Sequence, residues 1–151
     1  MSTNELSAAL WRQRDLLEML LFKYEEQQWI RAAGKTRWAP HATREIEVVV
    51  KRLGAANVAT SVAISGVASD WGLSEDVLLR DLVDAASDPV WKDILASHVD
   101  AIIGLIVEIR ALRDAGDNET ADGIPGVPTT YTQRGTTDHT IPTARLIDAT
   151  L

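Results

Sequence analysis

The sequence predicts an all-α protein, an elongated antiparallel helical hairpin or bundle of about three long helices plus one short helix. Three observations support this fold class. Apolar residues recur at spacings of three and four along three long segments, which is the period of a helix. Residues that favour helix starts precede these segments. Pro40 and Pro89 stand at expected helix starts, and the other three prolines lie beyond residue 116.

The segment from Ser2 to about Ala33 is the clearest helix. Ser2 and Glu5 fit a capping box, and Gly34 would end the helix as a C′ glycine. At 100° per residue, one core-facing stripe contains Leu6, Leu10, Leu17, Leu20, Leu21 and Tyr24. A helix of this length is not stable alone in water, so it needs partner helices.

The next segment carries two conflicting patterns. Thr36 is a possible cap, and Pro40 is tolerated in a first turn. Apolar residues recur at helical spacing from Ile46 to Val67, whereas the alternation from Val58 to Ile64 is typical of a strand. We favour a helix because its pattern persists for about six turns without a hairpin signal.

Two further helices are expected after a break at residues 71–73. Ser74 is expected to cap a short helix through about Ala86. Asp88 and Pro89 form a strong start for the last long helix. That helix is expected to end near Ala115–Gly116, which divides the chain into a helical bundle over 1–115 and a tail over 116–151.

The expected tail has an unusual composition. It contains nine Thr, four Gly and three Pro, and few large apolar side chains. Such a segment cannot bury enough apolar surface to fold alone, so we expect disorder or loose docking. A short amphipathic turn is possible at residues 144–151.

Composition and charge exclude several functional classes. The chain has 151 residues, 46% of them hydrophobic and 25% charged, with a net charge of −7. Residues 1–54 carry +2 and residues 55–151 carry −9. Nucleic acid is not expected as the main ligand, because phosphate binding needs a clustered basic surface.

No cysteine is present, which excludes disulfides, a Cys nucleophile and thiolate metal sites. Neither a secretory signal nor an apolar run of membrane-spanning length is found, so a cytoplasmic protein without a membrane partner is expected.

No residue pattern predicts catalysis. His98 lies between Leu95 and Ile102 on an apolar helix face and is expected to be a core or half-buried histidine. His41 and Glu45 could share a metal, but two ligands on one helix do not make a site. The serines and glycines match no nucleophile elbow, phosphate loop or dinucleotide fingerprint. We therefore expect a non-enzymatic protein without cofactor or metal.

Several stretches, in order along the chain, carry a family resemblance. They are residues 6–28, 32–38, 42–47, 71–73, 91–95 and 108–113, followed by Thr130-Tyr131, Gly135 and residues 144–148. Together they resemble the FlgN-type flagellar export chaperones of actinobacteria. The resemblance implies a cytoplasmic helical chaperone of type III export, which holds hook–filament junction proteins by a C-terminal helical segment and uses no cofactor.

The resemblance also implies a position for client binding, in the C-terminal helical part. By position this points to Ile102, Leu105, Ile106, Ile109 and Leu112. One departure from the family is expected. Its members usually continue the last helix well past the stretch that corresponds to residues 111–114, so an end near Ala115–Gly116 would remove several turns.

A second apolar strip lies on the first helix. Trp11, Phe22 and Trp29 fall at about 140–160° from the leucine stripe on the helical wheel, among charged residues. Other helices or long charged stems could cover these rings. Alternatively, the strip binds an apolar helix from a client or from a second copy of the chain.

Two other functions remain open from the sequence. One is a non-enzymatic helical scaffold or homo-oligomer. The other is an adaptor that binds a basic partner through residues 70–100, which carry eight acids against Arg80 and Lys92.

Overall fold

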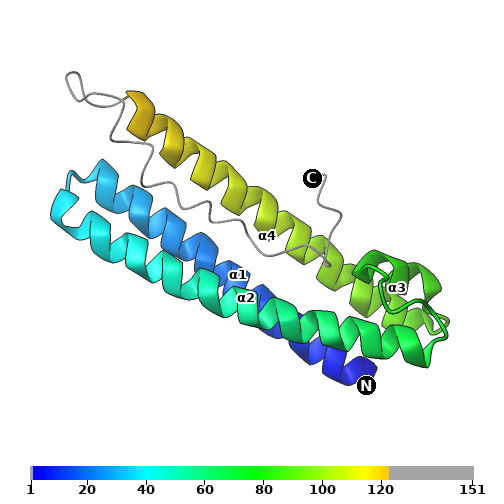
Figure 1. The fold of residues 1–151 in the computed structure, drawn as a ribbon. Coiled ribbons are helices and arrows are strands. Elements are labelled where there is room, and N and C mark those ends of the chain that lie inside the picture. Colours follow the sequence, from blue (N-terminus) through cyan, green and yellow to red (C-terminus); the bar gives the residue numbers. More distant parts are fainter. Residues whose placement is uncertain (1, 123–151) are drawn as a thin grey trace.

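The computed structural model describes residues 2–122 of the chain, with side chains for residues 2–117. All regular elements of this part are helical, which confirms the predicted fold class. Three long helices lie side by side in an elongated bundle, with the short helix at one end (Figure 1). Helix α4 runs in the same direction as α1, and α2 runs in the opposite direction. The elements are α1 (Thr3–Ala32), the 3₁₀ turn η1 (Thr36–Trp38), α2 (Ala39–Asp70), α3 (Leu79–Ala85) and α4 (Pro89–Asp122).

Helix α1 has the ends that the sequence predicts. The Glu5 amide donates to Ser2 Oγ at 3.2 Å, and the Ser2 amide donates to Glu5 Oε2 at 2.7 Å. This reciprocal capping box satisfies two amides that have no partner inside the helix. At the other end Gly34 has a φ of +69°, a left-handed conformation that glycine adopts without steric cost. The chain therefore reverses here into η1 and α2.

Helix α2 is continuous through the stretch that alternates like a strand. Its buried residues follow helical spacing, and packing against α1 decides the structure over the local β propensity. The predicted cap is wrong. Thr36 begins η1, and Trp38 precedes the helix without a side-chain cap. Pro40 lies in the first turn of α2, and the predicted break follows at Trp71 and Gly72.

Helix α3 begins later than predicted. Ser74 does not cap it, because the chain first makes a turn in which the Val77 amide donates to the Ser74 carbonyl at 3.3 Å. The helix starts at Leu79, and Asp81 Oδ2 accepts from the Leu78 amide at 2.8 Å. The delay places Leu79 and Leu82 in the core, where both are fully buried.

Helix α4 starts as predicted but ends later. Asp88 Oδ1 accepts from the Val90 amide at 2.9 Å in the first turn. The predicted end at Ala115–Gly116 is wrong, because α4 continues through Gly116 to Asp122. A glycine inside a helix costs only about 1 kcal/mol, which neighbouring turns can offset. Gly116 is buried, and a Cβ there would lie 3.1 Å from Arg31 Nη1, so its lack of a side chain accommodates α1.

The expected tail at 116–151 therefore cannot begin at residue 116. Residues 116–122 are helical. The expectation of disorder or loose docking for the remainder, and of a turn at 144–151, falls on residues 123–151, which lie outside the described residues.

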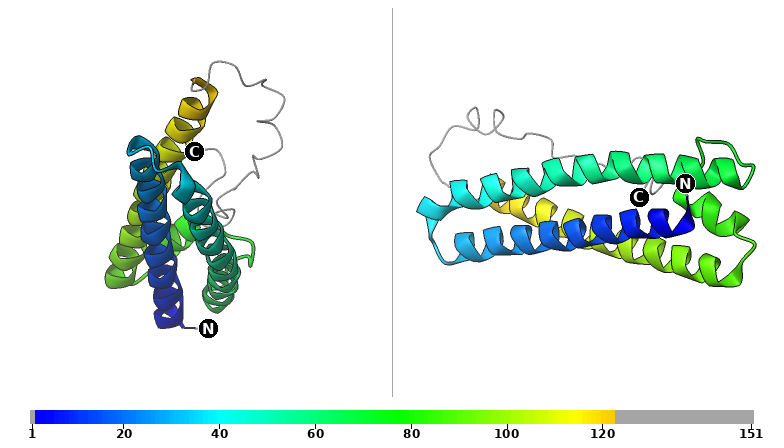
Figure 2. Two further views of the ribbon diagram at one scale, coloured as in Figure 1. Left: turned by 90° about the vertical axis from the view of Figure 1, so that its left-hand side faces the viewer. Right: turned by 90° about the horizontal axis from the view of Figure 1, so that it is seen from below.

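One core joins the helices, and α1 is central to it. Helix α1 packs against both α2 and α4 (Figure 2). The predicted stripe is confirmed, with Leu21 half-buried and the other five residues buried. The stripe meets large apolar side chains from the other helices, which include Ile46, Leu53, Ile64, Leu79, Leu82, Leu95, Ile102 and Ile109.

A polar pair interrupts this core between α1 and α2. Gln13 and Thr60 are both fully buried, and Thr60 Oγ1 lies 2.7 Å from Gln13 Oε1. The same hydroxyl lies 3.0 Å from the Ala56 carbonyl. Gln13 Nε2 is buried and has no hydrogen-bond partner among the described residues. The pair therefore carries a desolvation cost that one hydrogen bond offsets only in part.

This cost gives a testable prediction for stability. Thr60→Val alone leaves the Gln13 amide buried without its partner and should destabilise the fold by about 1–3 kcal/mol. The double variant Gln13→Leu/Thr60→Val replaces both polar groups and should recover most of this loss. Urea unfolding of the four proteins of the cycle measures both effects. Additive losses from the two substitutions would contradict the pairing.

Candidate functional site

The five α4 residues implied by the family resemblance face the bundle core. Ile102, Ile106 and Ile109 are at most 3% exposed. Leu105 and Leu112 are half-buried and pack against the same core. Their helical spacing is the spacing of the stripe that α4 buries. A client could reach the three isoleucines only if α4 moved away from the bundle.

The second apolar strip, on α1, is exposed, whereas the α4 residues are buried or half-buried. Trp11, Phe22 and Trp29 are 52%, 45% and 59% exposed. We call these three residues the α1 aromatic face. About half of each of these side chains is exposed, so the helices of the described part do not bury the face. Charged stems cover it only in part, as the following contacts show.

Trp11 forms one end of the α1 aromatic face and is held from two sides. The Arg14 guanidinium carbon lies 4.1 Å from the ring centroid, a cation–π arrangement. The ring also meets His98 of α4 edge-on, with centroids 5.2 Å apart. These contacts hold the Trp11 ring in place, while about half of the side chain remains exposed to solvent.

Phe22 and Trp29 form the other end of the face. Their ring centroids are 6.3 Å apart and their planes are inclined by 79°, the edge-to-face geometry that aromatic pairs prefer. The Lys23 ammonium lies 5.4 Å from the Phe22 centroid. The two rings therefore form a single exposed apolar unit.

His98 links α1 and α4 beneath Trp11. It is 2% exposed, as the sequence predicts for a core histidine. Its Nε2 lies 3.2 Å from Ser7 Oγ, and its Nδ1 lies 3.4 Å from Arg14 Nη1. Burial lowers the pKa of His98 below 6.5, and the positive charge of Arg14 lowers it further. The ring is therefore neutral at pH 7 and able to accept a hydrogen bond from Ser7 or Arg14.

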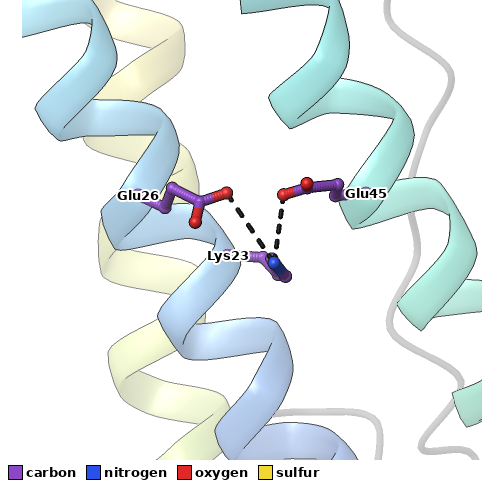
Figure 3. Close-up of polar contacts among 3 residues, drawn as sticks. All are labelled: Lys23, Glu26 and Glu45. Atoms are coloured by element: carbon purple, nitrogen blue, oxygen red, sulfur yellow. Dashed lines mark hydrogen bonds and ion pairs between the residues drawn. The ribbon is translucent and has the colours of Figure 1, made fainter.

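A charged cluster joins α1 to α2. Lys23 Nζ lies 3.0 Å from Glu45 Oε2 and 3.8 Å from Glu26 Oε1, so it bridges carboxylates of both helices (Figure 3). A hydrogen bond between the two carboxyl groups raises the pKa of Glu26 and lowers that of Glu45. The cluster therefore joins one ammonium and one carboxylate of α1 to a carboxylate of α2.

Beside this cluster, a groove of about 460 Å³ runs between α1 and α2. We call it the α1–α2 groove. Met19 borders it from α1, and Arg44, Val48 and Arg52 border it from α2. The groove could not be predicted from the sequence, because its two sides come from different helices. Arg44, Val48 and Arg52 are four residues apart on α2, but the opposing Met19 belongs to α1.

His41, also in this groove, does not form a metal site with its neighbours. Its Nδ1 lies 2.9 Å from Arg44 Nη2, and its ring packs beside Trp38 with centroids 5.5 Å apart. Among the described residues, no three His, Asp or Glu side chains are grouped so that they could hold a metal ion.

One described helical segment, Thr36–Asp70, is long and apolar enough to cross a membrane by length and composition. The sequence did not predict such a segment, because its apolar residues form no unbroken run of membrane-spanning length. In the structure the segment contributes Ile46, Leu53 and Ile64 to the core, and 33% of its apolar window is buried.

The chain matches no protein-family model, no curated protein and no solved structure.

The environment of His98 predicts a pH dependence of stability. Because the folded state lowers the pKa of His98, the unfolded chain binds this proton more readily. Stability should therefore be greatest above pH 6.5 and should fall as the pH drops from 6.5 through the folded pKa.

Chemical unfolding of wild type and His98→Gln between pH 7.5 and pH 5 measures this effect. The loss of stability on acidification should be smaller in His98→Gln. The control is His41→Gln, which changes an exposed histidine and should retain the wild-type slope. Equal slopes for all three proteins would show that His98 is not the group responsible.

Proposed function

We propose that this protein is a cytoplasmic, FlgN-like export chaperone that binds a helical segment of flagellar hook–filament junction proteins before type III secretion. The structural observation that carries the binding role is the exposed α1 aromatic face. The family resemblance supports the flagellar client, since it follows the chain in order from residue 6 to residue 148. The proposed role needs neither cofactor nor catalysis.

The spacing of the α1 aromatic face suits a helical client. Phe22 and Trp29 lie eleven and eighteen residues after Trp11. At 100° per residue, all three fall within about 20° of one direction, along about 27 Å of helix. A client helix of similar length could place apolar residues against all three rings. Large aromatic residues supply much of the binding energy at such interfaces.

The position of the face favours it over the α4 residues as the first client contact. Binding at Trp11, Phe22 and Trp29 leaves the core intact, because these rings are already exposed. Binding at Ile102, Ile106 and Ile109 would first require exposure of buried side chains. That opening would subtract from the affinity for the client.

The charges beside the rings indicate which client helices bind best. Asp15 and Glu18 are exposed on the same side of α1, between Trp11 and Phe22. A client helix with apolar anchors and flanking Lys or Arg would pair with them, whereas an acidic flank would be repelled.

Substitution of the two tryptophans tests the proposal. Trp11→Ser and Trp29→Ser should each weaken binding to a purified hook–filament junction protein by roughly 2 kcal/mol or more. Isothermal titration calorimetry measures the affinity, and thermal unfolding measures stability. The melting temperature should fall much less than for Leu17→Ala, in which a core cavity costs about 2–5 kcal/mol.

Trp38→Ser is the matched control, because Trp38 is also exposed but lies at the turn between α1 and α2. It should keep the wild-type affinity. The proposal fails if Trp38→Ser loses as much affinity as the two face variants. It fails equally if Trp11→Ser and Trp29→Ser unfold the protein as Leu17→Ala does.

A second candidate function is a self-associating scaffold, and one feature of α2 favours it. Residues 53–69 contain no charged side chain, and Val58 and Val62 are 64% and 55% exposed. Two copies could meet along this strip without repulsion despite their net charge of −7. Light scattering over a concentration series should then show a dimer that Val58→Glu/Val62→Glu abolishes. A monomer at all concentrations would reject the scaffold.

A further inference from the structure

The α1–α2 groove has a basic ridge along one wall. Arg44, Val48 and Arg52 are each four residues apart on α2 and are all exposed. Side chains at this spacing form one continuous row on a helix, here about 12 Å long. The row therefore presents a positive charge at each end and an apolar side chain at its centre.

The opposite wall consists of Met19 and Lys23 of α1, and an apolar side chain forms the floor of the groove. Met19 of α1 is 46% exposed and faces the groove, and Val48 across from it is 50% exposed. Val49, which is 5% exposed, lies below them. A side chain entering between Met19 and Val48 would bury apolar surface on both helices.

The charges of the ridge are available to a ligand. Lys23 forms ion pairs with Glu26 of α1 and Glu45 of α2, so its charge is neutralised locally (Figure 3). Within residues 2–117 no ion pair involves Arg44 or Arg52. Arg44 Nη2 lies 2.9 Å from Nδ1 of His41, and no carboxylate of the described residues pairs with its charge. The ridge is thus a positive strip on a chain whose net charge is −7.

We propose that the α1–α2 groove is a docking site for an acidic amphipathic helix of a partner protein. Two carboxylates of that helix, seven or eight residues apart, pair with Arg44 and Arg52. An apolar side chain midway between them packs on Met19 and Val48. Charge complementarity selects this occupant, because a basic helix would meet two unpaired arginines. The site is separate from the α1 aromatic face and does not depend on the client role.

The probe is a fluorescein-labelled, alanine-rich helical peptide with two glutamates seven residues apart and two leucines midway. Two companion peptides carry glutamine or lysine in place of both glutamates. Fluorescence anisotropy with the full chain at low salt measures each affinity. The glutamate peptide should bind about tenfold more tightly than the glutamine peptide, since each exposed charge pair contributes up to about 1 kcal/mol. Added salt should remove this preference.

Charge reversal locates the site. Arg44→Glu/Arg52→Glu should weaken binding of the glutamate peptide at least about tenfold and favour the lysine peptide instead. The matched control, Arg12→Glu/Lys51→Glu, changes the net charge equally at exposed positions that do not line the groove. It should retain the wild-type preference. Far-ultraviolet circular dichroism checks that both double variants remain folded.

A third variant tests the apolar part of the groove. Met19→Ser should weaken all three peptides without changing the order of their affinities. The inference is overturned if the two double variants lose affinity equally, if the glutamate and glutamine peptides bind alike, or if Met19→Ser has no effect. None of these results bears on client binding at Trp11 and Trp29.

Discussion

Helix α1 packs against both other long helices, and the remaining features of the molecule depend on that arrangement. Its stripe of five buried residues, from Leu6 to Tyr24, packs against α2 on one side and α4 on the other. An α-helix has a limited circumference, so a stripe that serves two neighbours leaves a single outward face. That face carries Trp11, Phe22 and Trp29, and the α1–α2 groove opens along its border with α2.

Polar contacts within and beside the stripe join α1 to each neighbour at defined positions. Toward α2 these are Gln13 with Thr60, Lys23 with Glu45, and Gln27 with Thr43 at 3.2 Å. Toward α4, Ser7 contacts His98, and Gln28 Nε2 donates to the Leu112 carbonyl at 3.1 Å. Leucine stripes alone allow helices to slide by a turn, and a buried polar pair opposes this because sliding would leave its groups unpaired. The neutral state of His98 belongs to the same constraint, since a proton on this ring would place a second charge beside Arg14.

The sequence predicted the features that depend on one helix at a time. The capping box at Ser2, the start at Asp88 and the leucine stripe follow from local chemistry and helical periodicity, whereas the sequence left open whether Trp11 is covered or exposed. Features that depend on the contact between two helices could not be predicted from the sequence alone. Gly116 appeared to end a helix, but its lack of a side chain accommodates Arg31 of α1. The isoleucines of α4 have the spacing of a binding strip and of a core stripe alike, and only the position of α1 decides between the two. The groove at Met19 and Val48 was invisible for the same reason.

Lys23 stands at the border between the two candidate binding surfaces and explains how they can differ in charge. Its ammonium lies near the Phe22 ring on one side and bridges Glu26 and Glu45 on the other. The Asp15 and Glu18 carboxylates lie on the side of the aromatic face, and the unpaired Arg44 and Arg52 lie on the far wall of the groove. The intervening cluster pairs one ammonium with two carboxylates, so it does not extend the positive strip of Arg44 and Arg52 toward the aromatic face. Because the field of an exposed charge falls off over about 10 Å at moderate salt, adjacent surfaces can keep opposite charge preferences.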